Sequence, residues 1–322
     1  MILTIIQNNK FRNLIPILII LIFLIIFPLI FNNSYVKHVM IMIFIYAIAG
    51  ESWNILGGYV GQVSLGHAIF FGVGAYTSSI LLLNFNINPW IGMLVGGCFA
   101  VILAFIIGML VFRLLGHFFA IATLSLGFIM YVVFLNLEYT KGAIGIELPL
   151  VEESIKNMSF TINKNGFYYI SLACLILVVF VVYIIIKSKL GYYFKTIKGD
   201  EDMARSIGIN TTFYKSIALS ISVFIAAMAG TLYAQYFLYI DPDMVFGVIL
   251  SIQFVIIVAL GGAGTILGPI LGSFIIIPII EITRIFFGGG GRGLDVLLYG
   301  ILIILIALFR PEGLITLFAP KK

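Results

Sequence analysis

The chain has 322 residues, of which 62% are hydrophobic and 10% charged, and its net charge is +5. No single soluble core could use this much apolar surface, so the composition excludes a soluble globular protein and predicts an all-α, polytopic membrane protein. The excess of Lys and Arg requires no nucleic-acid partner, because the orientation of a membrane protein accounts for it.

About ten stretches are apolar and long enough to cross a bilayer, which takes about 20 residues. We expect one transmembrane domain, 1–322, with spans at 14–31, 38–56, 68–84, 90–112, 118–137, 167–187, 217–240, 246–260, 269–287 and 295–309. The positive-inside rule then places Arg113, the loop at 188–216 and both termini in the cytoplasm. The mixed-charge loop at 138–166 falls on the extracytoplasmic side.

One acid, Glu51, lies well inside a predicted span. An intramembrane carboxyl group is costly to bury and is a functional candidate, here for a proton relay. We favour a structural role, with Glu51 protonated or hydrogen-bonded near Trp53 and Asn54, since a single acid without a partner makes a poor proton wire.

A cluster of glycines and polar residues, GQVSLGH, follows the second span. Glycine allows backbone conformations that other residues forbid, so we expect a broken helix, which is tolerated at membrane depth only against protein or a water-filled cavity. The candidate residues for a substrate pathway here are Gly58, Gly61, Gln62, Ser64, Gly66 and His67. Close helix packing explains the glycines equally well, and a lone histidine is more often a satisfied polar residue than a ligand or proton carrier.

The inner loop, 191–215, carries most of the polar residues on the predicted cytoplasmic side. Its sequence predicts a short helix that Asp200 caps, that Glu201 stabilises at its positive end, and that Gly208 terminates.

Met203 and Ile207, four residues apart, share one face of this short helix, and we place Ala204 beside them. A capped helix with a small apolar face suits a groove on a cytoplasmic partner, although ordinary juxtamembrane helices have the same pattern.

A second glycine-rich stretch, GGAGTILGPILGS at 261–273, follows the eighth span. Its candidate pathway residues are Gly261, Gly262, Gly264 and Thr265, and Pro269 suits the first turn of the next helix. Two glycine-interrupted segments in corresponding parts of a transporter indicate its substrate path.

Three stretches resemble the membrane permease subunits of branched-chain amino-acid ABC importers, and the resemblance covers most of the chain. They are GGYVGQVSLGHAIFFGVGAYTSSIL from Gly57, YIDPDMVFGVILSIQFVIIVALGGAGTILGPILGS from Tyr239, and FRPEGL from Phe309. The inner loop is similar to that family's coupling loop, which docks on the ATP-binding subunit. Matching positions are Gly191, Asp200, Glu201, Ala204 and Gly208, while Thr196, Lys198 and Met203 depart from the usual residues.

The resemblance implies a non-catalytic permease subunit in a bacterial cytoplasmic membrane, with no cofactor and no metal. Its implied partners are a second related permease, two ATP-binding subunits, an extracytoplasmic substrate-binding protein and membrane lipid. The sequence contains no G-x-x-x-x-G-K-[ST] phosphate loop, which agrees with ATP hydrolysis in a separate subunit. Leucine, isoleucine and valine are the implied substrates, and similar permeases carry urea or short amides.

Two other classes of protein remain as alternatives. An ion-coupled secondary transporter would use Glu51 or His67 as its coupling group. An intramembrane enzyme would need a metal pair or a nucleophile with its base, and the sequence shows no HExxH motif, no paired aspartates and no assignable Ser/His/Asp set.

Overall fold

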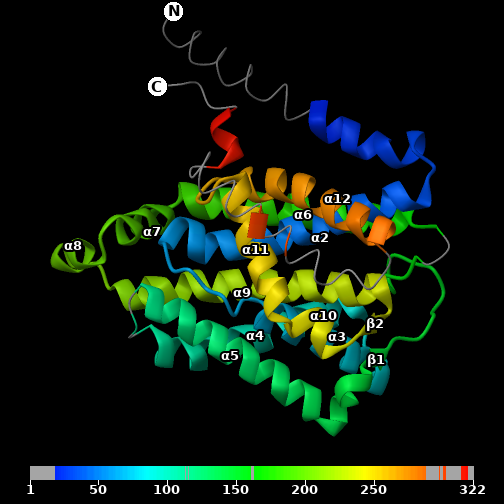
Figure 1. Ribbon diagram of the computed structural model, residues 1–322, viewed down its shortest axis with the longest axis horizontal. Helices are drawn as coiled ribbons and strands as arrows, with labels where there is room; N and C mark the ends of the chain where they lie inside the picture. Colours follow the sequence, from blue (N-terminus) through cyan, green and yellow to red (C-terminus); the bar gives the residue numbers. More distant parts are fainter. Residues whose placement is uncertain are drawn as a thin grey trace, which may run out of the picture.

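The structure, a computed structural model, describes residues 19–112, 114, 116–160, 163–287, 297, 300–301 and 313–317. It is a bundle of helices, most of which run along the long axis of the molecule (Figure 1). Among the described residues, eight helices are long and apolar enough to cross a membrane. They confirm the all-α, polytopic fold.

The predicted total of about ten spans is not confirmed. The span expected at 14–31 corresponds, in the described part, to a shorter apolar helix, Ile19–Ile30. The span expected at 295–309 and both chain termini lie largely or wholly outside the described residues.

The described elements after this first helix are α2 (Ser34–Trp53), η1 (Asn54–Val60), α3 (Ala68–Phe85), α4 (Pro89–Val111), α5 (His117–Asn136), η2 (Glu138–Thr140), η3 (Gly142–Ile144), β1 (Ile146–Glu147), α6 (Asn165–Lys187), α7 (Lys189–Gly199), α8 (Glu201–Ser206), α9 (Thr211–Phe237), β2 (Tyr239–Ile240), α10 (Pro242–Phe246), α11 (Val248–Gly261), α12 (Gly268–Phe287) and η4 (Leu314–Leu317).

Short polar side chains begin many of these helices. Each satisfies a backbone N–H group that has no partner inside the first turn. The capping side chains are Asn33, Asn88, Ser188, Asp200, Asn210 and Asp241. Pro89 and Pro242 follow two of these caps, at a position where proline loses no helical hydrogen bond.

Helix α2 is the centre of the bundle, and α6, α9, α11 and α12 pack around it. In its most apolar stretch 94% of the residues are buried, against 17% in α5. Helices α3 and α4 pack on α9 to form a second layer, and α5 lies on the outside (Figure 1). The central helix is therefore shielded from lipid, which allows it to carry polar residues that a lipid-facing helix could not.

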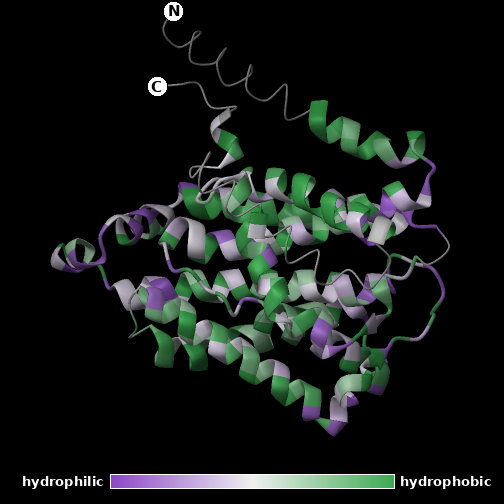
Figure 2. Ribbon diagram, in the orientation of Figure 1, coloured by the Kyte–Doolittle hydropathy of each residue, from purple (hydrophilic) through white to green (hydrophobic). Residues whose placement is uncertain are grey.

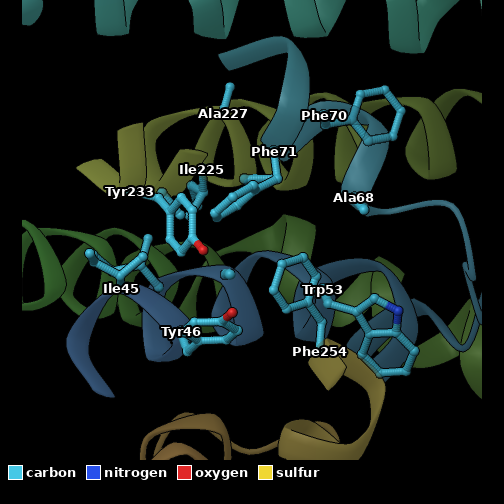
Figure 3. Close-up of a cluster of buried hydrophobic side chains, with 14 of the residues drawn as sticks. Ile45, Tyr46, Trp53, Ala68, Phe70, Phe71, Ile225, Ala227, Tyr233 and Phe254 are labelled. Atoms are coloured by element: carbon cyan, nitrogen blue, oxygen red, sulfur yellow. The ribbon is translucent and has the colours of Figure 1, made fainter. Parts of the chain in front are cut away.

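Four aromatic side chains join the central helices (Figure 3). Phe254 of α11 lies with its ring centroid 6.1 Å from that of Tyr46 in α2 and 5.7 Å from that of Phe71 in α3. Phe71 in turn lies 5.4 Å from Tyr233 of α9. Lipid is as apolar as these rings, so their contribution comes from close packing rather than from removal of water.

Helices α3 and α9 cross in close contact. A Cβ atom on Gly74 would overlap the backbone of Ala227, and one on Gly230 would overlap the carbonyl group of Phe71. Small residues allow two membrane helices to approach until their backbones touch.

Hydrophilic residues gather at the two ends of the long axis, around α7 and in the loop after α5 (Figure 2). The second end also carries the two-residue pairing of β1 with β2, in which Ile146 faces Ile240 and Glu147 faces Tyr239. The apolar middle and polar ends have the arrangement that a bilayer requires.

Candidate functional site

The first glycine-rich stretch forms a break between α2 and α3, but it lies later than the sequence predicts. Helix α2 does not end at Gly57 and Gly58; it widens into the π-helix η1 and continues to Val60. Gly61 then adopts a φ of 84°, in the left-handed region that favours glycine, and α3 begins at Ala68. A π-helix inside an α-helix frequently marks a functional position.

His67 is fully buried at the end of this break. Its Nε2 lies 2.9 Å from the Ser222 hydroxyl and 3.1 Å from the Ser52 hydroxyl. Ser222 donates its own proton to the Ser52 carbonyl oxygen at 2.5 Å, so it accepts from His67, which places the ring proton on Nε2. His67 therefore joins α2, α3 and α9 through Nε2, while its buried Nδ1 has no hydrogen-bond partner among the described residues.

The other residues of the first break make structural contacts of several kinds. The Ser64 carbonyl oxygen accepts a hydrogen bond from Trp53 Nε1 at 2.7 Å. Gly66 lies so close to the Thr123 carbonyl oxygen of α5 that a Cβ atom would overlap it. Gln62 is buried and its backbone N–H donates to the Leu56 carbonyl oxygen at 3.1 Å.

The second glycine-rich stretch separates α11 from α12. Gly261 ends α11 against the carbonyl group of Gly268, and Gly262 and Gly264 have φ values of 127° and 80°. The Thr265 hydroxyl donates to the Gly262 carbonyl oxygen at 2.7 Å and accepts from the N–H of Gly268 at 3.1 Å. Thr265 thereby caps α12, and Pro269 occupies the first turn as predicted.

The two breaks lie against each other, although about 200 residues separate them in the sequence. The Asn54 side chain in η1 accepts from the Gly264 N–H and donates to the Thr265 carbonyl oxygen, each at 2.8 Å. A Cβ atom on Gly58 would lie 2.6 Å from the Gly264 nitrogen. Asn54 and two glycines thus hold both breaks in one junction, which we call the break junction.

Lys198, near the end of α7, binds the break junction from outside. Its ammonium group donates to the Gly58 carbonyl oxygen at 2.7 Å, and its aliphatic stem lies beside Gly61. The π-helical turn leaves that carbonyl group available to an outside donor. Helix α7 is therefore bonded directly to the first break, which Asn54 in turn bonds to the second.

Helix α8 has the capping that its sequence predicts. Asp200 Oδ1 accepts from the Met203 N–H at 2.9 Å, and Gly208 follows the helix with a φ of 87°. Gly191 packs at the start of α7, where a Cβ atom would overlap the Ile186 carbonyl group, so it permits the sharp turn out of α6.

The apolar face of α8 is smaller than the sequence suggests. Met203 is 65% exposed and Ile207 is 67% exposed, whereas Ala204 is fully buried inside the chain. The placement of Ala204 on the exposed face is wrong, because the helix packs on α9 through that side. Helix α8 projects from one end of the bundle, at the left edge of Figure 1, with Met203 and Ile207 open to a partner.

An ion cluster fastens α8 to α9. Glu201 bonds to Lys215, which is 1% exposed, to Arg205 at 2.7 Å and to the Thr211 hydroxyl at 3.1 Å. Burial alone would raise the pKa of the Glu201 carboxyl, but the Lys215 ammonium and these other donors outweigh it and hold the pKa below its ordinary value. Glu201 is therefore ionised at neutral pH and anchors α8.

Glu51 is fully buried in α2, and neither of its carboxyl oxygens has a hydrogen-bond partner among the described residues. The structural role expected for Glu51, protonated or hydrogen-bonded near Trp53 and Asn54, stays a prediction, and the Asn54 side chain bonds to the second break. Among these residues, Glu51 is the acid that best fits an ion-coupled mechanism.

The sequence did not predict the roles of three residues. Ser222 is the partner of His67, Lys215 belongs to the ion cluster of Glu201, and Asn54 links the two breaks. Lys198 was noted only as a departure from a family pattern. A lysine close to a predicted docking helix, and an amide inside a predicted span, were the available signals for two of them.

Comparison with known proteins gives the family. Residues 35–307 match the family model described as branched-chain amino acid transport system / permease component. The chain belongs to this family. It is similar to the high-affinity branched-chain amino acid transport system permease protein LivM of Escherichia coli (strain K12), with 29% identity over 86% of this chain and 69% of the relative.

The same chain is also similar to the permease protein LivH of Salmonella typhimurium, of the same named transport system, with 24% identity over 84% of this chain and 91% of LivH. A solved structure, PsaBC from Streptococcus pneumoniae in complex with Fab, matches 92% of the permease chain and 99% of its own chain, with a TM-score of 0.47 and 14% identity.

Proposed function

We propose that this permease is a membrane subunit of an ATP-driven ABC importer that carries branched-chain amino acids or similar small solutes, including urea or short amides. It would act in a bacterial cytoplasmic membrane, with both termini in the cytoplasm. Its partners would be a second related permease, two ATP-binding subunits that hydrolyse ATP, and an extracytoplasmic binding protein. The observation that carries the proposal is α8, whose apolar side chains project from the bundle while the neighbouring α7 is bonded to the break junction through Lys198 and Gly58.

The proposed mechanism is alternating access. Closure of the ATP-binding subunits moves α8, and the ion pairs of Glu201 transmit this movement to α9. The hydrogen bond of Lys198 to Gly58 transmits it to the break junction. The two breaks then act as hinges that open the inner side of the pathway, since packed elements with two arrangements turn small shifts into domain movement.

In this mechanism the candidate pathway residues fall into two groups, one in the junction and one in the segment that leads to α3. Gly58, Gly264 and Thr265 belong to the junction that moves, together with Gly261 and Gly262. Gly61, Gln62, Ser64, Gly66 and His67 belong to the segment that connects the junction to α3. When the junction opens, backbone N–H groups released in these segments would receive the carboxylate of the solute.

The test is co-purification of the permease with the ATP-binding subunit encoded beside it. A negative charge at a desolvated apolar contact should abolish docking, so Met203→Asp and Ile207→Asp are expected to release the ATPase. Leu150→Asp is the control, because Leu150 is 75% exposed in the loop at the other end of the bundle. Retention of the ATPase by both α8 variants would refute docking through this helix.

The buried, unpartnered carboxyl group of Glu51 supports a second candidate function, a secondary transporter coupled to protons or sodium. That function predicts uptake without any ATPase and loss of uptake on addition of an uncoupler. The importer predicts the opposite result in the same vesicles.

A further inference from the structure

A cavity of about 310 Å³ lies at the end of the bundle opposite α7 and α8. It is open on one side and is lined by the start of α2, the start of α6 with Ser159, Phe160 and Lys164 before it, and the end of α9. Its lining includes His38, Lys164 and Gln235 as polar groups, and Phe160, Phe167 and Tyr236 as aromatic ones. The volume is at the small end of the range for sites that bind small molecules.

Gln235, one of the lining residues, carries an unused hydrogen-bond donor. The side chain is only 4% exposed, and its Nε2 has no hydrogen-bond partner among the described residues. Leaving a buried amide unsatisfied costs free energy that a bound acceptor would recover.

Lys164 supplies an unpaired positive charge. No carboxylate of the described residues lies within ion-pair distance of its ammonium group, which instead lies 5.8 Å from the centroid of the Tyr236 ring. Burial lowers the pKa of Lys164, as expected for a cation that has lost part of its water and gained no counter-ion.

The nearby acid does not neutralise this lysine. Glu281 binds Arg284 at 3.0 Å and lies 3.5 Å from His38 Nε2, so its charge is already balanced. His38 Nδ1 is in turn 2.6 Å from the Tyr236 hydroxyl, which fixes the ring that faces Lys164. The cavity therefore combines one free cation, one free amide donor and aromatic walls.

We propose that this cavity is an entry-side binding site for a small aliphatic amino acid, whose carboxylate pairs with Lys164 and accepts from Gln235 while its side chain lies against Phe160 and Phe167. The carboxylate has only acceptors, which suits the donors of Lys164 and Gln235, and the Ser159 hydroxyl in the same lining can accept from the ammonium group of the amino acid. The inference rests on the proposed function for the substrate class and for the orientation that makes this end extracytoplasmic.

The experiment uses the assembled permease–ATPase complex, without its binding protein, and measures equilibrium binding of radiolabelled L-leucine. Lys164→Met and Gln235→Leu are expected to weaken binding, Lys164→Met by roughly 10- to 100-fold, the range for loss of a charge-assisted hydrogen bond. Lys164→Arg should keep most of the affinity. Lys156→Met removes an exposed lysine of the same loop and is the matched control. Basal ATP hydrolysis verifies that each variant is assembled.

Leucine binding that is equal in Lys164→Met, Gln235→Leu and Lys156→Met would overturn the proposal. The proposal would also be overturned if phosphatidylglycerol, but not phosphatidylcholine, displaced leucine from the wild type and this displacement were lost in Lys164→Met. The site would then hold a lipid headgroup. Wild-type complex that imports leucine from its binding protein but binds none alone also refutes the site and leaves the proposed function standing. Absence of ATP-driven import by the wild type would refute the function itself.

Discussion

The substitution Gly58→Ala tests whether the two glycine-rich breaks really share one junction. The added methyl group would overlap Asn54 Oδ1 and lie 2.6 Å from the Gly264 nitrogen, both of which are held by other contacts. Overpacking of this kind costs roughly 1–3 kcal/mol. Loss of the hydrogen bond between Asn54 and Gly264 adds about 0.5–1.5 kcal/mol, so we expect a total of about 1.5–4.5 kcal/mol.

Gly199→Ala is the matched control for this substitution. Gly199 ends α7, a few residues from the junction, and a Cβ atom there would meet nothing within 4 Å. The free energy of unfolding of both variants can be measured by titration of the purified chain with a denaturing detergent. If Gly58→Ala lies within about 0.5 kcal/mol of Gly199→Ala, the usual range for a harmless surface substitution, the breaks do not meet as described.

Three further predictions concern the inner loop and the central helix. Lys198→Met should lower the amount of leucine imported per ATP hydrolysed, while Lys198→Arg retains it; an unchanged ratio in Lys198→Met would show that the Gly58 bond transmits nothing. The lowered pKa of Glu201 means that its stabilisation of α8 is present at neutral pH and is lost as the pH falls below about 4.3 and through the folded-state value. Glu201→Gln should reproduce the acid effect at pH 7 by leaving Lys215 buried without its counter-ion, at a cost of up to about 3 kcal/mol, detected as faster proteolysis at α8; equal cleavage rates would refute the anchor. Glu51→Gln should leave ATP-driven uptake intact in vesicles treated with an uncoupler, whereas loss of uptake there would favour the ion-coupled alternative.

The sequence is a good guide to features that depend on neighbouring residues. Eight predicted spans and the cap of α8 by Asp200 are present, because apolar length and capping are local properties. The position of Pro269 in the first turn of α12 is local in the same sense.

Contacts between segments that are far apart in the chain could not be predicted from the sequence. The bonds from Lys198 to Gly58 and from His67 to Ser222 join residues 140 and 155 positions apart, and no periodic pattern encodes such pairs. Ala204 was misplaced for a similar reason: a helix of six residues has too few positions to show which face packs on α9.

The short pairing of β1 with β2 limits how α6 and α9 can move relative to each other. It joins Ile146 to Ile240 and is extended by the hydrogen bond from the Leu148 N–H to the Leu238 carbonyl oxygen at 2.8 Å. The chain from α6 to α9 is thereby clipped into a closed loop at one end of the bundle, with α7 and α8 at the other. Because the pairing ties the loop that leads into α6 to the end of α9, we expect a push on α8 to tilt the two long helices together rather than to slide one past the other.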